Sequence, residues 1–278
     1  MKKNTSNIWL VLILLLGLSL LLYPSFADWW NSFTQSRVIA TYAETVANID
    51  TNRYDNLWQA AWEYNESLLD RENVYILSEE QKQAYNDHLN IGQNGVMGYI
   101  EIPDLKVTLP IYHGTNEAIL QVAVGHLEWT SLPVGGRSSH CVLSGHRGLT
   151  SARLFTDLDK MAEGDIFLLR VLDEVLSYEV DQITIVEPHE VELLHITEGE
   201  DYCTLVTCTP YGVNSHRLLV RGHRIATQEE ARVVRVTADA IQIQPTIVAP
   251  FLAAPVLLVL LVMLLLPKRK KPRKEEIL

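Results

Sequence analysis

The chain has 278 residues, of which 47% are hydrophobic and 21% charged, and its formal net charge is −11. This composition excludes a disordered or low-complexity chain. The length is sufficient for one well-packed domain of ordinary size with additional attached segments.

Two uncharged apolar runs lie near the ends of the chain, at residues 8–23 and 247–266. The second has the roughly 20 residues that a helix needs to cross a hydrocarbon core of about 30 Å. The first is shorter, and with Lys2, Lys3 and residues 25–27 (SFA) it also resembles a cleavable signal peptide. Either interpretation sends the middle of the chain across a membrane.

Basic residues predict the orientation in that membrane. The positive-inside rule puts Lys2, Lys3 and the stretch KRKKPRK (residues 268–274) in the cytoplasm. We therefore expect a two-pass protein of the cell membrane, with both termini cytoplasmic and residues from about 28 to 246 outside the cell. That external part is strongly acidic, which argues against a nucleic-acid partner.

The predicted organisation has six segments. They are an N-terminal transmembrane segment or signal anchor (1–27), an external helical appendage with a candidate lid (28–94), a β domain (95–226), a juxtamembrane linker (227–246), a transmembrane helix (247–266) and a basic cytoplasmic tail (267–278). Within the appendage, apolar residues at three- and four-residue steps predict helix between residues 34 and 69. A shorter helix is expected around residues 79–86.

After residue 95 the pattern changes to short stretches rich in β-branched and apolar residues, bounded by turn residues. Seven such strands are expected, at VMGYIEIP, KVTLPIYHG, SHCVLSGH, DIFLLRVL, VLSYEVDQITIVEP, YCTLVTCTP and HRLLVRGHRI. One short helix is predicted at residues 152–161 (ARLFTDLDKM). Seven or eight short strands with few helices predict a mainly β domain, either a closed barrel or a sandwich.

The three cysteines are Cys141, Cys203 and Cys208. An odd number outside the cell leaves at least one thiol free or paired between chains. Cys203 and Cys208 are five residues apart, so in a strand they point to opposite faces. Cys141 and Cys203 are expected to be small core residues, whereas Cys208 ends the strand TLVTC just before Pro210 and lies at the mouth of the sheet.

A nucleophilic thiol needs a base or a cation beside it. If the strands on either side of residues 209–215 pair as a hairpin, Arg217 returns to the end of the sheet that carries Cys208. The preferred histidine is His146, at a strand-to-turn boundary in VLSGHRG. The other candidates are His126, His216 and His223.

A metal site is the next alternative, because His140, Cys141 and His146 lie close in sequence. No CxxC or HxxxH spacing accompanies them, so no metal is expected. The residues by themselves therefore predict a membrane-held external β domain with one candidate thiol, and they leave the reaction open.

The block TLVTC followed by TPYGVNSHRLLVRG resembles the active-site signature of sortases, the cysteine transpeptidases of Gram-positive cell surfaces. GVMGYIEIP, LPIYHGT, VGHLEWTSLPVGG, HCVLSGHRGL and ARLFTDLDKM are similar to class C, the pilin-polymerising sortases, in the same order. This resemblance implies an eight-stranded β-barrel in which Cys208 is the nucleophile, His146 the catalytic histidine and Arg217 the oxyanion-binding arginine.

The resemblance also implies the reaction. The substrate would be a pilin subunit with an LPxTG-like sorting signal, held on Cys208 as a thioester and passed to an acceptor Lys of another pilin without a cofactor. Two alternatives remain open: a housekeeping-type sortase that attaches proteins to a cell-wall precursor, and a non-enzymatic membrane-held binding module.

One stretch departs from the class C pattern. Residues 68–81 (LLDRENVYILSEEQ) stand where that class commonly has an Asp-Pro-aromatic lid, and they contain no Asp-Pro. Asp70 and Tyr75 are the candidate lid residues, with a polar linker as the alternative.

Overall fold

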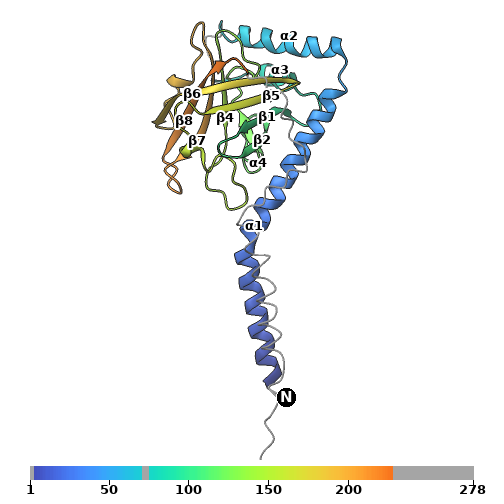
Figure 1. The fold of residues 1–278 in the computed structure, drawn as a ribbon, viewed down its shortest axis with the longest axis vertical. Coiled ribbons are helices and arrows are strands. Elements are labelled where there is room, and N and C mark those ends of the chain that lie inside the picture. Colours follow the sequence, from blue (N-terminus) through green and yellow to red (C-terminus); the bar gives the residue numbers. More distant parts are fainter. Residues whose placement is uncertain (1–2, 71–74, 228–278) are drawn as a thin grey trace, which may run out of the picture. The chain divides into compact units, whose positions relative to one another are not determined.

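The computed structural model describes residues 3–70 and 75–227, and its centre is a closed barrel of eight strands (Figure 1). Around the barrel the strand order is β1-β2-β3-β4-β7-β8-β6-β5. The strands are β1 (Val96–Ile102), β2 (Val107–His113), β3 (Val124–His126), β4 (Ser139–Ser144), β5 (Ile166–Val171), β6 (Glu174–Val186), β7 (Asp201–Thr209) and β8 (His216–Ile225). Of the two β architectures that the sequence allowed, the barrel is the one that forms.

The seven strands expected from the sequence are all present. The eighth, β3, has only three residues, too few to show an alternating pattern. It completes the barrel by pairing parallel to β2 and antiparallel to β4. Closure matters because an open sheet would present unpaired backbone groups at its edges.

The barrel core is built by alternate residues of the strands. Leu143 of β4, Leu205 of β7 and Val220 of β8 are cross-strand neighbours and have no exposed surface. Gly125 of β3 shows how closely the backbones approach, because a Cβ atom there would lie 2.3 Å from the carbonyl oxygen of Gly114.

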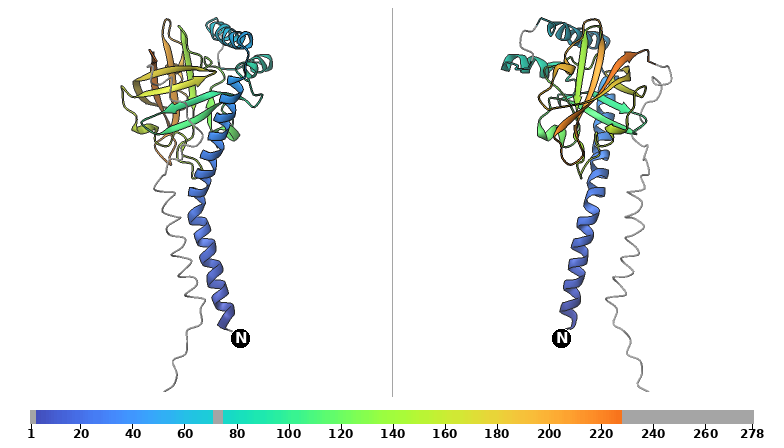
Figure 2. Two further views of the ribbon diagram at one scale, coloured as in Figure 1. Left: turned by 45° about the vertical axis from the view of Figure 1, so that its right-hand side comes forward. Right: turned by 90° about the vertical axis from the view of Figure 1, so that its left-hand side faces the viewer.

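The N-terminal appendage is helical, as expected. It consists of α1 (Lys3–Ala47), α2 (Thr51–Ser67) and α3 (Glu79–Asp87). α2 begins after Asp50, whose side chain accepts a hydrogen bond from the Arg53 backbone N–H. α3 begins with a capping box between Ser78 and Gln81. α2 and α3 lie next to each other beside the barrel in both views of Figure 2.

Apolar side chains attach this appendage to the barrel. Trp58, Ala61 and Tyr64 of α2 belong to the main hydrophobic core. Tyr42 of α1 is buried, and its hydroxyl donates to the Met97 carbonyl at 2.8 Å. The appendage is therefore packed against the barrel, and the contacts of α1 begin at Asn31, whose side chain donates to the Ser151 carbonyl at 2.9 Å.

The helix predicted at residues 152–161 is wrong. Only Leu158–Lys160 form a short 3₁₀ helix, η1, and the preceding residues form turns. The Phe155 backbone N–H donates to the His146 carbonyl at 3.1 Å, and Phe155 is buried. This long-range bond, with burial of the aromatic ring, holds the segment in turns where local propensity favoured a helix.

Among the described residues, one helix is long and apolar enough to cross a membrane. It runs over Val11–Ala47, and its apolar window has a mean hydropathy of 2.0 with none of it buried. The chain divides into two units at residues 29 and 30, inside α1. The expected second span, residues 247–266, and the basic tail lie outside the described residues.

Candidate active site

The parallel pairing of β4 with β7 brings His146 and Cys208 to one end of the barrel. Ser144 is the register partner of Val206, and each candidate residue follows two positions later on its own chain segment. The ladder continues beyond Ser144, because the Gly145 N–H donates to the Val206 carbonyl at 3.0 Å. A segment of 62 sequence positions separates His146 from Cys208, yet they leave neighbouring strands side by side.

Arg217 is the direct cross-strand partner of Cys208 in the antiparallel pair β7–β8. The hairpin expected from the sequence is therefore present. Arg217 Nη1 donates to the carbonyl oxygens of Asn214 at 3.3 Å and His216 at 3.1 Å, which holds the guanidinium near the turn. Cys208 is half-buried, whereas Cys141 and Cys203 are buried.

His146 also lies near an acidic residue that the sequence did not single out. Its Nε2 atom is 3.7 Å from Glu117 Oε2, and the imidazole is 27% exposed. Glu117 begins the short helix α4 (Glu117–Leu120), which is capped by the Asn116 side chain. A carboxylate at this distance from Nε2 can help to orient the imidazole ring. No local signal marked Glu117, because its proximity to His146 arises from the folded chain.

Arg147 joins the segments on either side of the site, and sequence analysis missed this residue as well. Its Nη2 atom forms an ion pair with Asp159, and Nη1 contacts Thr209 Oγ1 at 3.5 Å. The guanidinium carbon also lies 5.8 Å from the ring centroid of Tyr211. Thr209 and Tyr211 follow Cys208, so Arg147 connects the turn after His146 to the turn after the thiol.

The outer surface of the barrel beside Cys208 is apolar. A second hydrophobic cluster there contains Val142, Val186, Leu194, Val206 and Leu219, with Leu127 and Trp129 packed against it. Cys208 and Arg217 extend the same strand faces as Val206 and Leu219, because side chains two residues apart share a face. Cys208 and Arg217 therefore adjoin this buried apolar cluster.

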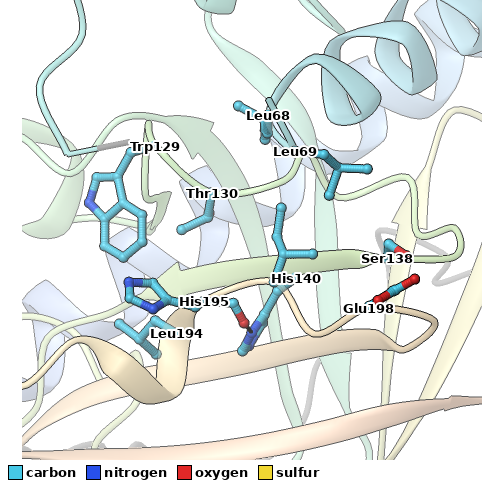
Figure 3. Close-up of a pocket in the computed structure, with 10 residues that line it drawn as sticks. Leu68, Leu69, Trp129, Thr130, Ser138, His140, Leu194, His195 and Glu198 are labelled. Atoms are coloured by element: carbon cyan, nitrogen blue, oxygen red, sulfur yellow. Dashed lines mark hydrogen bonds between the residues drawn. The ribbon is translucent and has the colours of Figure 1, made fainter. Parts of the chain in front are cut away.

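A cavity of about 570 Å³ continues from this surface toward the appendage. Figure 3 shows Trp129 and His195 close together at one side of it, with Ser138 and Glu198 at the other. His140 also lines the cavity. Burial lowers the pKa of His140 to about 4, so its imidazole is neutral near pH 7.

The two candidate lid residues differ in their positions. Tyr75 lies against the cavity: its hydroxyl hydrogen-bonds to His195 Nε2, and its ring packs edge-on against Trp129 with centroids 5.0 Å apart. Asp70 is exposed, in the turn that follows α2. Residues 71–74 between them are outside the described part of the chain.

The other candidate histidines have different positions. His126 is fully buried, with Nδ1 2.9 Å from the Tyr85 hydroxyl and Nε2 2.8 Å from the Ser131 carbonyl. His216 contacts its neighbour Ser215, and His223 pairs with Tyr202 far along β8 from the thiol. Within residues 3–70 and 75–227, no group of three or more His, Cys, Asp or Glu could hold a metal ion.

This barrel, with a half-buried thiol opposite an arginine and a histidine on the adjoining parallel strand, defines a candidate cysteine acyltransferase. Residues 100–225 match the sortase domain family. The structure is similar to sortase C1 from Streptococcus agalactiae, with 48% identity and a TM-score of 0.68 over 69% of this chain and 100% of that one. It is also similar to sortase C from Streptococcus pneumoniae, with 46% identity and a TM-score of 0.60 over 69% of this chain and 97% of the other.

A third solved structure, of Clostridium perfringens sortase C with the C-terminal cell wall sorting motif, is 44% identical, with a TM-score of 0.61 over 69% of this chain and 99% of that one. Sortase A from Streptococcus agalactiae is 34% identical over 117 residues, and the match covers 41% of this chain and about half of that relative, 47% of its length. The chain belongs to the sortase family, the cysteine transpeptidases, and its structural neighbours are class C sortases. This membership favours the transpeptidase prediction over the non-enzymatic alternative.

Proposed function

We propose that this protein cleaves an LPxTG-like sorting signal between Thr and Gly and transfers the acyl group to a Lys amine of a second pilin subunit. The observation that carries the proposal is the register of three strands. It puts the Cys208 thiol opposite Arg217 and at the same barrel end as His146. These three residues supply a nucleophile, an oxyanion-binding cation and a proton-transfer group.

The first half-reaction is acylation of Cys208. Its thiolate attacks the carbonyl carbon of the substrate Thr, and the developing oxyanion accepts hydrogen bonds from the Arg217 guanidinium. His146 donates a proton to the departing Gly amine as the C–N bond breaks. Glu117 Oε2, 3.7 Å from His146 Nε2, helps to hold the imidazole in position for this step. The product is a thioester on the Cys208 sulfur.

The second half-reaction transfers the acyl group. The Lys amine attacks the thioester carbonyl, an isopeptide bond forms, and the Cys208 thiolate leaves. His146 accepts the proton that the amine loses. No cofactor enters the scheme, because the thioester retains the acyl group in an activated form.

The pilin acceptor is supported by the neighbours. The Streptococcus pneumoniae sortase C structure is described in relation to pilin substrate specificity, and the Clostridium perfringens enzyme was solved with a sorting motif. The sequence of this chain does not identify the acceptor amine. A cell-wall precursor amine is therefore the alternative that the experiment must distinguish from a pilin Lys amine.

A membrane location fits this reaction. We propose that both termini are cytoplasmic and the barrel external, anchored by the helix over Val11–Ala47 and by the apolar residues 247–266. Substrates that await processing on the same membrane are then held near the enzyme, which raises their effective concentration.

We further propose that Tyr75 belongs to a lid. Its ring contacts His195 and Trp129, and Trp129 packs against the apolar cluster beside Cys208. Substrate binding then requires these contacts to open. This lid relies on an aromatic ring and a histidine, without the Asp-Pro pair of the usual class C motif.

The test is intact-mass spectrometry of the full-length protein in detergent, incubated with a peptide that contains an LPxTG-like signal. We expect an added mass equal to the peptide up to its Thr, absent from Cys208→Ala. Arg217→Ala should acylate about 10²–10³-fold more slowly, the loss typical of one oxyanion donor. Tyr75→Ala should acylate faster than the unaltered protein.

A pilin-derived Lys peptide and a cell-wall precursor amine, offered separately, then identify the acceptor. Release of the acyl group to the Lys peptide alone supports pilus assembly, and release to the precursor amine alone supports the housekeeping alternative. Absence of an adduct in both the unaltered protein and Tyr75→Ala, across several motif variants, would refute the proposed cleavage.

A further inference from the structure

Cys141 and Cys203 are direct partners on neighbouring strands. They face each other in the parallel register of β4 and β7, and both side chains point into the barrel core. Neighbouring strands lie about 4.8 Å apart, which falls within the roughly 4.4–6.8 Å between Cα atoms that a disulfide bridges. Both side chains are almost completely buried, with 2% of Cys141 and none of Cys203 exposed.

The two thiols interact in the reduced protein. Burial raises the pKa of the Cys203 thiol well above its usual value, and the neighbouring Cys141 sulfur raises it further. Burial acts in the same direction on Cys141, but hydrogen bonds from Cys203 and His126 overcome it and lower the pKa of that thiol. The two sulfur atoms are therefore close enough to affect each other's ionisation.

Each cysteine of this pair lies the same number of residues before one of the candidate site residues. Cys141 precedes His146 by five residues, and Cys203 precedes Cys208 by five residues. The register of β4 with β7 at the cysteine pair is therefore the same register that brings the histidine beside the catalytic thiol. A covalent bond at this position would prevent one strand from slipping along the other.

We propose that Cys141 and Cys203 form a disulfide across the barrel wall and that Cys208 is the single free thiol of the mature protein. This inference rests on the external location given under the proposed function, because disulfides persist in oxidising compartments. It accounts for three cysteines in an extracellular domain that requires one reactive thiol. It also prevents Cys208 from forming a disulfide with Cys141 or Cys203.

The oxidant is an extracytoplasmic thiol–disulfide oxidoreductase in its disulfide form. The Cys141 thiolate attacks one sulfur of that disulfide, releases the other as a thiolate and leaves a mixed disulfide. The Cys203 thiolate then attacks the Cys141 sulfur and releases the second oxidoreductase sulfur. Two electrons and two protons pass to the oxidoreductase, which becomes a dithiol. Because both protein sulfurs are buried in the closed barrel, the exchange takes place while the chain folds.

The test uses the full-length protein made in a Gram-positive host and collected from its membranes. Cells are quenched in acid, and the protein is denatured and alkylated with N-ethylmaleimide without reductant. We expect one alkylated cysteine and a mass two hydrogens below that of the reduced chain carrying one N-ethylmaleimide group. Trypsin leaves Cys203 and Cys208 on one peptide, residues 171–217, so Cys208→Ala assigns the pairing. That variant should carry no alkylated cysteine and should yield peptide 171–217 joined to the peptide that contains Cys141.

Stability supplies a second measurement. The bond closes a loop of 62 sequence positions, so a reductant that opens it should lower Tm by about 5–15 °C. The double variant C141A/C203A should show no dependence of Tm on reductant. It should still form the thioester at Cys208, although its own Tm is lower because the pair is lost.

Three alkylated cysteines in the membrane-derived protein would overturn the proposal, as would two alkylated cysteines in Cys208→Ala. The thioester assay keeps this inference separate from the proposed function. A disulfide found without peptide acylation would support this inference and refute the proposed cleavage. Acylation by a protein with three free thiols would support the cleavage and refute the disulfide.

Discussion

Acid should destabilise this protein through one particular buried histidine, His140. Its imidazole lies between two fixed partners: Nδ1 is 2.9 Å from the His195 carbonyl and Nε2 is 2.7 Å from Thr204 Oγ1. The carbonyl can only accept, so Nδ1 carries the proton and Nε2 accepts from the Thr204 hydroxyl. The positive charge of Arg221 disfavours a second proton, and Asp181 acts in the opposite direction.

The magnitude follows from the difference between the folded and unfolded states. Burial lowers the pKa of His140 from 6.5 to about 4 in the folded protein. Between these values the unfolded chain binds the proton and the folded chain does not, so the free energy of unfolding falls as pH decreases. At about 1.36 kcal/mol per pKa unit, the loss between pH 7 and pH 4 is about 3 kcal/mol.

The assay compares thermal unfolding of the full-length protein with that of His140→Asn at pH 7 and pH 4. For a domain of this size, about 3 kcal/mol corresponds to a change in Tm of roughly 6–12 °C. The unaltered protein should lose that much more than the variant over the pH interval. His88 and His113, whose pKa values are also lowered by burial, remain in both proteins and cancel in the comparison.

His189 provides a matched control, because its side chain is 77% exposed. His189→Asn should retain the full acid sensitivity of the unaltered protein. Equal losses of Tm in the unaltered protein and in His140→Asn would refute the reasoning, since they would show that His140 accepts its proton in the folded state at no cost.

Two further predictions concern the fold around the site. Tyr42→Phe removes a buried hydroxyl that donates to the Met97 carbonyl and accepts from the Leu172 N–H at 2.8 Å. The free energy of unfolding, measured in urea or by thermal unfolding, should therefore fall by about 1–3 kcal/mol. An unchanged value would mean that water replaces the hydroxyl. Gly145→Ala puts a Cβ atom 2.7 Å from the Phe155 ring, one residue before His146. It should slow acylation at least tenfold while reducing Tm by only a few degrees. Acylation at the normal rate would show that Phe155 moves aside without disturbing the imidazole.

The sequence by itself determined the local elements and the chemistry-bearing residues. Short runs of β-branched and apolar residues bounded by turn residues marked seven of the eight strands in the described part of the chain, and three- and four-residue steps marked helix in the appendage. The turn residues after Cys208 placed that thiol at the end of its strand, and the short hairpin loop returned Arg217 to it. These features depend on residues near one another along the chain, so local physical chemistry is sufficient to predict them.

The tertiary structure decided what depends on distant segments. Residues 152–161 form turns instead of a helix because Phe155 is held by the His146 carbonyl and the core. β3 is too short to carry a pattern and exists because β2 and β4 pair with it. Glu117 reaches His146 only in the folded chain.

The parallel pairing of β4 with β7 is the main example of this limit. It joins strands that are 62 positions apart, and no local pattern specifies which strands become neighbours or in which register. That register brings His146 beside Cys208 and, five residues earlier, Cys141 beside Cys203. Strand partners are selected by closure of the whole barrel and burial of its core, and for that reason the sequence supplied the residues of the site while the fold assembled them.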